Sequence, residues 1–277
     1  MAPVRIVTDS TAFLDQEILV KYNIAVVPLY VNFENEVIID GSISNAEFFA
    51  KVRSSTKMPF TSQPSPGDFV KVFEKIIEDG NDIVTIVISS GISGTYESAL
   101  NAAKMVDMNR IAVIDSKSTA GGLAMLVMEA AEAAAQGKNR EEIAAFIEAK
   151  KSHVRLFFVP DTLEYLKKGG RIGGAQALIG TLLKIKPVLH LNNGKVDAFD
   201  KVRTMKKALE RIIDEMPPSK GVFPLHLLHA EAPVTVETLK HMVKERFPQA
   251  QITISELSPV IGTHSGPGVV GICFYAQ

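Results

Sequence analysis

The chain has 277 residues and a formal net charge of −1, with 46% hydrophobic and 22% charged residues. This length accommodates one large domain or two ordinary ones, and the hydrophobic content is ample for their cores. A nearly neutral chain without a long basic run argues against nucleic acid as a partner. The single cysteine, Cys273, excludes an internal disulfide and any metal site built from several thiolates.

Two features argue against export and membrane insertion. Asp9 interrupts the N-terminus before an apolar stretch of signal-peptide length can form. The most apolar long stretch, 119–137, carries Glu129 and Glu132 and therefore indicates a buried helix. We expect a cytoplasmic protein.

The first half of the chain alternates between short runs rich in Val and Ile and amphipathic segments. Strands are predicted at 4–10, 24–33, 82–89 and 110–116. Helices are predicted at 14–23, 45–55, 66–80, 95–106 and 119–137. Continuous apolar strands that alternate with helices indicate a parallel sheet covered on both faces. Sheets of this kind bind ligands beyond the carboxyl ends of their strands, so the polar clusters at 7–11, 88–95 and 113–119 are expected to share one crevice.

The pattern changes after a charged helix predicted at 139–153. Strands are then predicted at 154–160, 222–230, 252–258 and 269–276, and short helical pieces at 162–168 and 174–184. Asn193-Gly194 stands between two apolar runs in 186–202, which predicts a hairpin with a primed turn. We therefore predict an α/β fold with two domains. Residues 1–150 would form an N-terminal three-layer α/β/α domain with a mainly parallel sheet, and residues 151–277 a smaller C-terminal α/β domain with a mixed sheet.

The segment 88–95, Ile-Ser-Ser-Gly-Ile-Ser-Gly-Thr, connects a predicted strand to a predicted helix. One interpretation is a nucleophile elbow, because Ser93, Asp115 and His264 follow the chain order of a hydrolase triad. Thr95, however, stands where the elbow requires a second glycine. Another interpretation is a binding loop, in which backbone N–H groups and hydroxyls meet a ligand at the positive end of the helix. The plainest interpretation is that one hydroxyl only caps the helix.

Two other segments carry candidate binding groups. Thr61 and Ser62 precede a helix start at 65–68, in a loop fixed by flanking prolines, and the alternative is a hydrated surface loop. His264 stands in a glycine-rich loop expected at 262–271. An imidazole there can donate to a carboxylate or carry a proton near neutral pH, and the alternative is a histidine in water.

The segment 166–174, Leu-Lys-Lys-Gly-Gly-Arg-Ile-Gly-Gly, lacks the pattern of a nucleotide-binding loop. Arg171 and its lysine neighbours form either a solvated basic edge or a docking site for an acidic partner.

Metal binding has little support in the sequence. His226 and His229 would point to opposite faces of a strand. Asp9 and Asp115 are the acidic residues best suited to a magnesium ion, although capping or internal hydrogen bonding explains them better. We predict no metal site.

Seven segments resemble, in order and spacing, those of the DegV family. They are 7–14, 26–33, 60–69, 88–99, 113–126, 162–174 and 263–271. The resemblance covers essentially the whole chain and implies the two α/β domains already predicted. The characterised members of this family are fatty-acid-binding subunits of the bacterial fatty acid kinase system. Such a subunit buries a free fatty acid and presents its carboxyl group to a separate kinase, with no turnover of its own.

The resemblance also implies a partner and a set of site residues. The kinase subunit supplies ATP and magnesium and makes an acyl phosphate for phospholipid synthesis, so this chain needs no cofactor. Carried onto this sequence, the carboxylate of a long-chain fatty acid would meet Thr61, Ser93, the Gly94 amide and His264. Ser62 would support them from behind. Arg171 would lie near the kinase-facing surface. Transient membrane contact is compatible with this role. The resemblance does not imply which acyl chain is preferred.

The physics of fatty-acid binding agrees with this assignment. At about 0.8 kcal/mol per CH₂, a C16 tail gains on the order of 12 kcal/mol before ordering costs. A buried carboxylate loses its hydration, which several hydroxyls and an amide would replace, with an imidazolium as a further candidate. Two other classes stay open: a serine hydrolase that uses Ser93, Asp115 and His264, and an interaction protein with a vestigial crevice.

Overall fold

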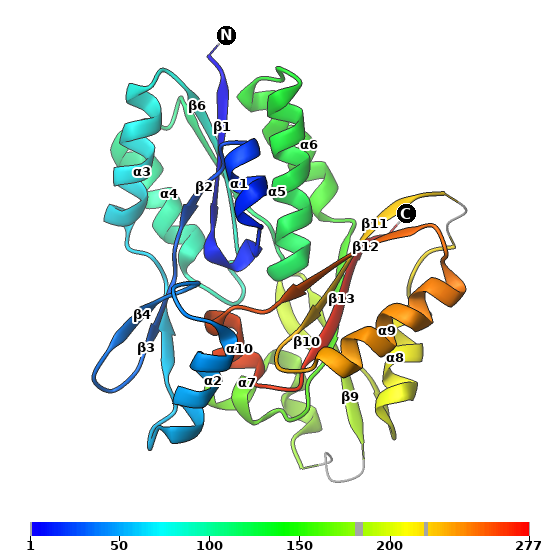
Figure 1. The fold of residues 1–277 in the computed structure, drawn as a ribbon. Coiled ribbons are helices and arrows are strands. Elements are labelled where there is room, and N and C mark those ends of the chain that lie inside the picture. Colours follow the sequence, from blue (N-terminus) through cyan, green and yellow to red (C-terminus); the bar gives the residue numbers. More distant parts are fainter. Residues whose placement is uncertain (1, 181–184, 219–220, 277) are drawn as a thin grey trace.

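The computed structural model describes residues 2–180, 185–218 and 221–276 (Figure 1). Within these residues the strands form three sheets. The first is a parallel sheet of order β2-β1-β6-β7. Its strands are β1 (Val4–Asp9), β2 (Ala25–Val27), β6 (Asp82–Val87) and β7 (Ile111–Asp115). They are continuous apolar runs because helices cover both faces of the sheet.

These helices form two layers. One face carries α3 (Pro66–Glu78) and α4 (Thr95–Val106), and the other carries α1 (Gln16–Lys21), α5 (Ala120–Ala135) and α6 (Arg140–Lys151). Successive strand residues point to opposite faces. Ile6 therefore belongs to the core with α5 and α6, whereas Val7 belongs to the core with α3 and α4. The predicted three-layer arrangement and the α/β class are confirmed.

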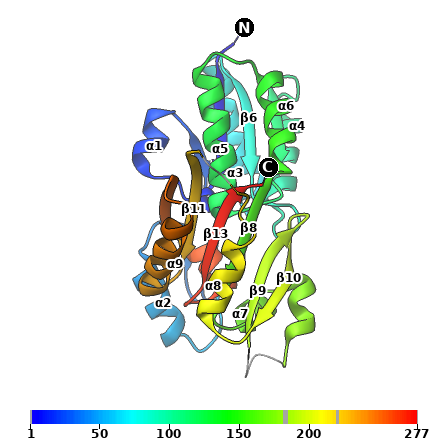
Figure 2. The ribbon, with the colours of Figure 1, turned by 90° about the vertical axis from the view of Figure 1, so that its right-hand side faces the viewer.

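The second sheet is mixed, with the order β10-β9-β8-β13-β11-β12. Its strands are β8 (Val154–Val159), β9 (Lys186–Asn192), β10 (Lys195–Val202), β11 (Phe223–His229), β12 (Ala250–Glu256) and β13 (Val270–Tyr275). Only β11 and β12 pair in parallel among the described strands of this sheet. The helices α8 (Met205–Ile213) and α9 (Pro233–Arg246) cover one face (Figure 2). Phe157 and Val159 point toward these helices, so Leu156 and Phe158 point to the other face.

The hairpin between β9 and β10 has the predicted primed turn. Both turn residues have positive φ angles, 48° at Asn193 and 79° at Gly194, as a type I′ turn requires. The turn packs against the loop between β6 and α4, where the Ser89 hydroxyl donates to the Gly194 carbonyl at 2.7 Å. A Cβ at Gly194 would lie 2.1 Å from Ser89 Oγ, so this contact requires glycine.

The third sheet corrects the prediction. It is antiparallel, has the order β4-β3-β5, and consists of β3 (Tyr30–Asn32), β4 (Val37–Ile39) and β5 (Phe60–Ser62), with α2 (Asn45–Ser54) beside it. The single strand predicted at 24–33 is wrong, because the chain leaves the first sheet after Val27 and Pro28 lacks a donor for a sheet ladder. The loop predicted around Thr61 is strand β5. We call these three strands and α2 the small-sheet unit.

Short helical segments complete the described structure. They are η1 (Ser10–Ala12), α7 (Glu164–Lys168), η2 (Gly173–Leu178) and α10 (Pro259–Ser265). The prediction of a loop around His264 is therefore wrong, because His264 belongs to α10. The piece predicted at 174–184 is a 3₁₀ helix over its first half, and residues 181–184 lie outside the described residues.

The predicted division of the chain at residue 150 stays a prediction. The parallel sheet ends before this point and the mixed sheet begins after it. The small-sheet unit, however, packs against α10, which comes from the other side of the division. Phe48 and Phe49 of α2 share a core with Val260 of α10, and a Cβ at Gly262 would lie 3.0 Å from the ring of Phe49.

Candidate functional site

A cavity lies between the parallel sheet, the mixed sheet, β5 and α10. The space between its lining atoms, part of it open to solvent, is about 800 Å³. Most lining side chains are aliphatic or aromatic: Leu29, Ile88, Ile92, Ala120, Leu156, Phe158, Leu166, Leu191, Val196, Leu228, Leu257, Val260, Ile261 and Val269. The polar lining residues are Thr61, Ser93, Thr119, Arg171, His264 and Ser265. This composition, mostly apolar with a few polar groups, is typical of a pocket for one small, largely apolar ligand.

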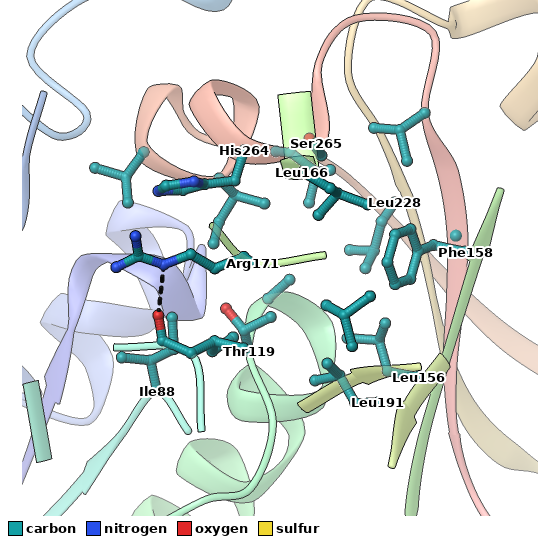
Figure 3. Close-up of a pocket in the computed structure, with 18 of the residues that line it drawn as sticks. Ile88, Thr119, Leu156, Phe158, Leu166, Arg171, Leu191, Leu228, His264 and Ser265 are labelled. Carbon is teal, nitrogen blue, oxygen red and sulfur yellow. Dashed lines mark hydrogen bonds between the residues drawn. The ribbon is translucent and has the colours of Figure 1, made fainter. Parts of the chain in front are cut away.

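Polar groups gather toward one end of the cavity, where Ile88 also lies (Figure 3). In Figure 3, His264 and Arg171 lie at one end, and Phe158, Leu156 and Leu191 lie at the opposite end. The apolar end uses the inner face of the mixed sheet. Gly271 of β13 pairs with Phe158 of β8, and a Cβ at Gly271 would lie 3.1 Å from Phe158 Cβ. Glycine at this position therefore leaves space for the phenylalanine side chain.

Thr61 and His264 meet at the polar end. Thr61 Oγ1 lies 2.7 Å from His264 Nε2, although the two residues are 203 positions apart in the chain. His264 Nδ1 is buried and has no hydrogen-bond partner in the described part of the chain. It faces Gly169, where a Cβ would lie only 2.2 Å away. The imidazole therefore fits closely between β5 and the end of α7.

The protonation state of His264 follows from its surroundings. Burial, and then the nearby charge of Arg171, lower the pKa of His264 from 6.5 to about 4. With this pKa the ring is neutral at neutral pH, which favours an imidazole over an imidazolium at this position. A neutral ring still has one N–H group, so the Thr61–His264 pair can offer a donor without adding a buried charge.

Ser62 lies on the other face of β5. Neighbouring strand residues point in opposite directions, and the Ser62 hydroxyl accepts from Asn32 Nδ2 at 3.0 Å. Ser62 is not among the residues that line the cavity. The strand geometry thus argues against direct contact between Ser62 and a ligand in the cavity.

The loop from β6 to α4 brings Ser93 to the same end. Its hydroxyl lies 2.9 Å from Thr95 Oγ1 and 3.4 Å from the Thr95 amide nitrogen. Gly94 occupies the N-cap position and has no side chain with which to cap α4. A Cβ at Gly94 would lie 2.4 Å from the Gln63 side-chain amide. The positively polarised N-terminus of α4 therefore begins next to Ser93, a residue that lines the cavity.

Arg171 holds two segments together and also lines the cavity. Its Nε donates to the Ile92 carbonyl at 3.0 Å (Figure 3), and its Nη1 donates to the Gly169 carbonyl at 2.7 Å. Carbonyl groups do not neutralise a guanidinium, and Arg171 forms no ion pair with any residue that the structure describes. The polar end therefore carries a positive charge available to an anionic group.

The three residues of the hydrolase alternative do not assemble. His264 pairs with Thr61, and Ser93 pairs with Thr95. Asp115 accepts from the Ser90 amide at 3.1 Å and forms an ion pair with Lys117 at 2.6 Å. Because neither Ser93 nor Asp115 hydrogen-bonds to the imidazole, the hydrolase alternative is not supported.

The acidic residues considered for magnesium are used internally, as predicted. Asp9 accepts from the Thr11 amide and hydroxyl at 2.9 and 2.6 Å and from the Ile88 amide at 2.6 Å. Among the described residues no group of three or more His, Cys, Asp or Glu side chains is placed to hold a metal ion. In the same part of the chain, no helix is long and apolar enough to cross a membrane.

Some cavity residues were not identified from the sequence. Thr119 lines the cavity at the start of α5, and its hydroxyl has no partner within the described residues. Its position at the end of the polar cluster 113–119 was the available signal. Leu156, Phe158 and Leu228 carried no signal, because a residue facing a cavity and a residue facing a core have the same pattern.

This geometry defines a class of protein: an α/β protein with a mostly apolar cavity that carries polar groups toward one end. Residues 3–277 match the family model described as "Uncharacterised protein, DegV family". A DegV domain-containing protein of Listeria innocua is 38% identical over 274 residues, which cover 97% of each chain. The chain belongs to the DegV family.

Solved structures agree over the full length. A DegV family protein of Thermus thermophilus, described by its fatty acid binding, has a TM-score of 0.93 and 36% identity, covering 99% of this chain and 100% of that one. DegV of Bacillus subtilis, described as a fatty acid binding protein, has a TM-score of 0.90 and 34% identity, with 100% of both chains covered.

Proposed function

We propose that this protein is a carrier that buries one long-chain fatty acid and presents its carboxyl group to a separate ATP-dependent fatty acid kinase. The observation that carries the proposal is a cavity with a mostly apolar lining and with Thr61, Ser93, Arg171 and His264 at its polar end. The fatty-acid-binding descriptions of the Thermus and Bacillus proteins support the same ligand class.

The apolar end would supply most of the affinity. A C16 tail transferred from water gains on the order of 12 kcal/mol, from which the ordering costs of chain and protein are subtracted. Burial of such a tail requires a dry channel and no specific polar contact. The aliphatic lining supports this requirement.

The polar end would replace the hydration of the carboxylate. Hydrogen bonds to a charged group contribute about 1.5–3 kcal/mol each. The Ser93 hydroxyl, the Gly94 amide and the N-terminus of α4 are donors on one side. If Nε2 of His264 carries the ring proton and donates to Thr61, the Thr61 hydroxyl is left to donate to the ligand. The Arg171 charge adds long-range attraction for the anion.

In this proposal the chain performs no chemistry of its own. No assembled nucleophile is found among Ser93, Asp115 and His264, and the phosphoryl donor, ATP with magnesium, would bind to the kinase. The acyl phosphate would then pass toward phospholipid synthesis in the cytoplasm, with transient membrane contact at delivery. Such a carrier needs no cofactor.

Native mass spectrometry of the protein purified from cells tests the carrier role. We expect an added mass equal to one long-chain fatty acid, which is lost after delipidation and restored by palmitate. Protein that carries no added mass, and that neither binds palmitate nor gains thermal stability from it, would favour an interaction protein with a vestigial crevice.

The docking role predicted for Arg171 can be separated from ligand contact. We expect Arg171→Gln to lower kinase-dependent phosphorylation even when palmitate saturates the carrier. If the variant only raises the Kd for palmitate, and saturating palmitate restores full phosphorylation, Arg171 is a ligand contact and not a docking residue.

A further inference from the structure

Asp40 is a buried carboxylate that lies outside the cavity. It follows β4 and is 6% exposed. Its Oδ1 accepts from the Val260 amide at 3.0 Å, and its Oδ2 accepts from the hydroxyls of Ser258 at 2.8 Å and Ser10 at 2.7 Å. These donors come from segments distant in the chain. Burial raises the pKa of Asp40, and the three hydrogen bonds act against that rise by stabilising the charged form.

One of these bonds, from the Val260 amide, replaces the missing side-chain cap of α10. Ser258 occupies the N-cap position but makes no capping hydrogen bond with its side chain, and Pro259 has no N–H group. The Val260 amide is thus the first donor of the helix, and Asp40 accepts it. A helix of seven residues is not stable by itself. A carboxylate at its positive end contributes both a hydrogen bond and a favourable interaction with the helix dipole.

The capped turn leads directly to His264. Val260 and His264 are four residues apart, so they lie one turn apart on the same face of α10, and both line the cavity. The fit of the imidazole against Gly169 leaves little space for displacement. A rotation or shift of α10 would therefore change the Thr61–His264 contact.

Asp40 also connects to the strand that carries Thr61. Its amide donates to the Leu29 carbonyl at 2.9 Å, and the Ser10 hydroxyl that donates to Asp40 accepts from the Leu29 amide at 3.1 Å. Leu29 precedes β3, the strand that pairs Val31 with Thr61 of β5. One carboxylate thus joins α10 to the small-sheet unit, which are the two sides of the Thr61–His264 pair.

We propose that Asp40 is a positioning residue, which sets the spacing between Thr61 and His264 and thereby the strength with which the cavity holds a carboxylate. The claim about carboxylate binding rests on the proposed function. Asp40 touches neither the ligand nor the cavity surface and acts through α10 and β3.

The test compares Asp40→Ala and Asp40→Asn with Asn139→Ala, using delipidated protein and palmitate as the probe. Asn139 caps α6 far from the cavity, accepting from the Glu142 amide at 2.9 Å, so it controls for the loss of a cap. We expect Asp40→Ala to raise the Kd for palmitate about tenfold. Asp40→Asn keeps one acceptor for Val260 and should have a smaller effect. Asn139→Ala should leave the Kd within about twofold of the parent.

A second readout does not depend on the ligand. Nitrogen-15 NMR of the His264 ring, assigned with His264→Gln, reports its pKa. We expect Asp40→Ala to raise the pKa from about 4 toward its ordinary value, because a displaced ring meets water. Asn139→Ala should not change it. If the parent protein binds no palmitate, the proposed function is wrong. The pKa of the His264 ring then still tests whether Asp40 positions His264.

The proposal is overturned if Asp40→Ala retains both the parent Kd and the parent ring pKa. Should Asp40→Ala fail to fold, Asp40→Asn and Ser258→Ala serve in its place. Parent values for both readouts in these two variants would equally overturn it.

Discussion

The apolar end of the cavity is lined by side chains from neighbouring strands of one sheet, whereas the polar end is assembled from segments far apart in the chain. Leu156, Phe158 and Leu228 lie on the inner face of the mixed sheet, and the same sheet buries its outer face beneath α8 and α9. Thr61 and His264 meet only because the small-sheet unit packs on α10. The apolar end is thus part of the core, and the polar end depends on single hydrogen bonds.

This difference predicts that changes at the apolar end affect stability more than affinity. Leu228 is 3% exposed, and Leu228→Ala should reduce the free energy of unfolding by about 2–5 kcal/mol. Palmitate affinity should fall less than about tenfold, because many side chains share the apolar contact. Urea unfolding and palmitate titration measure the two quantities.

Leu239→Ala is the matched control. Leu239 is fully buried in α9 and does not line the cavity, so it should lose similar stability with unchanged affinity. A loss of affinity in Leu228→Ala far larger than its loss of stability would contradict the distinction between the two ends.

The next effect is a pH dependence from the polar end. His264 has its pKa lowered to about 4, so below its ordinary value of 6.5 the unfolded chain binds a proton first. Its contribution to stability therefore falls as the pH falls from 6.5 to 4, by on the order of 3 kcal/mol. Asp9 acts oppositely. Burial raises its pKa from 3.8 to about 6, so the folded chain binds the proton first and gains stability as the pH falls.

His264→Gln separates these opposing contributions. We compare the free energy of unfolding of the variant with that of the parent at each pH. The difference, variant minus parent, should be more positive at pH 4 than at pH 7, by on the order of 3 kcal/mol. Urea unfolding at the two pH values measures this offset. An equal offset at both values would show that His264 is not held neutral in the folded protein.

Single hydroxyls at the polar end should affect affinity with little effect on stability. We expect Ser93→Ala and Thr61→Ala each to raise the Kd for palmitate about tenfold, because each removes one donor to a buried carboxylate. Calorimetric titration of delipidated protein measures both. Parent affinity in both variants would show that the carboxylate lies elsewhere.

The smallest effect is expected one residue away from Thr61. Ser62 points to the outer face of β5 and pairs with Asn32, so Ser62→Ala should leave the Kd for palmitate within about twofold of the parent. The same titration serves as the measurement. If Ser62→Ala loses as much affinity for palmitate as Thr61→Ala, the ligand does not distinguish the two faces of β5.

The regular parts of the fold were predictable because their signals are local. Val/Ile runs between amphipathic segments predicted the parallel sheet, and Asn193-Gly194 predicted a turn that has both positive φ angles. The small-sheet unit was missed because its three-residue strands are too short to show a period. The helix α10 was missed because it has only seven residues and because Gly262, Gly266 and Gly268 indicated a loop.

The candidate site follows the same division. The sequence predicted that Ser93 lies between the end of a strand and the start of a helix, because the pattern of residues 82–106 indicates these two elements. The pairing of Thr61 with His264 was implied only by the resemblance to the DegV family, since no local pattern joins residues 203 positions apart. The neutral state of His264 depends on its burial, which requires the packed structure.

The central claim is that a carboxylate occupies the polar end while its alkyl chain fills the apolar end. Carbon-13 NMR of palmitate labelled at its carboxyl carbon tests this claim most directly. We predict one bound signal that shifts in Ser93→Ala and Thr61→Ala and is unchanged in Ser62→Ala. A bound signal identical in all three variants, or no bound signal with the delipidated parent, would contradict the account.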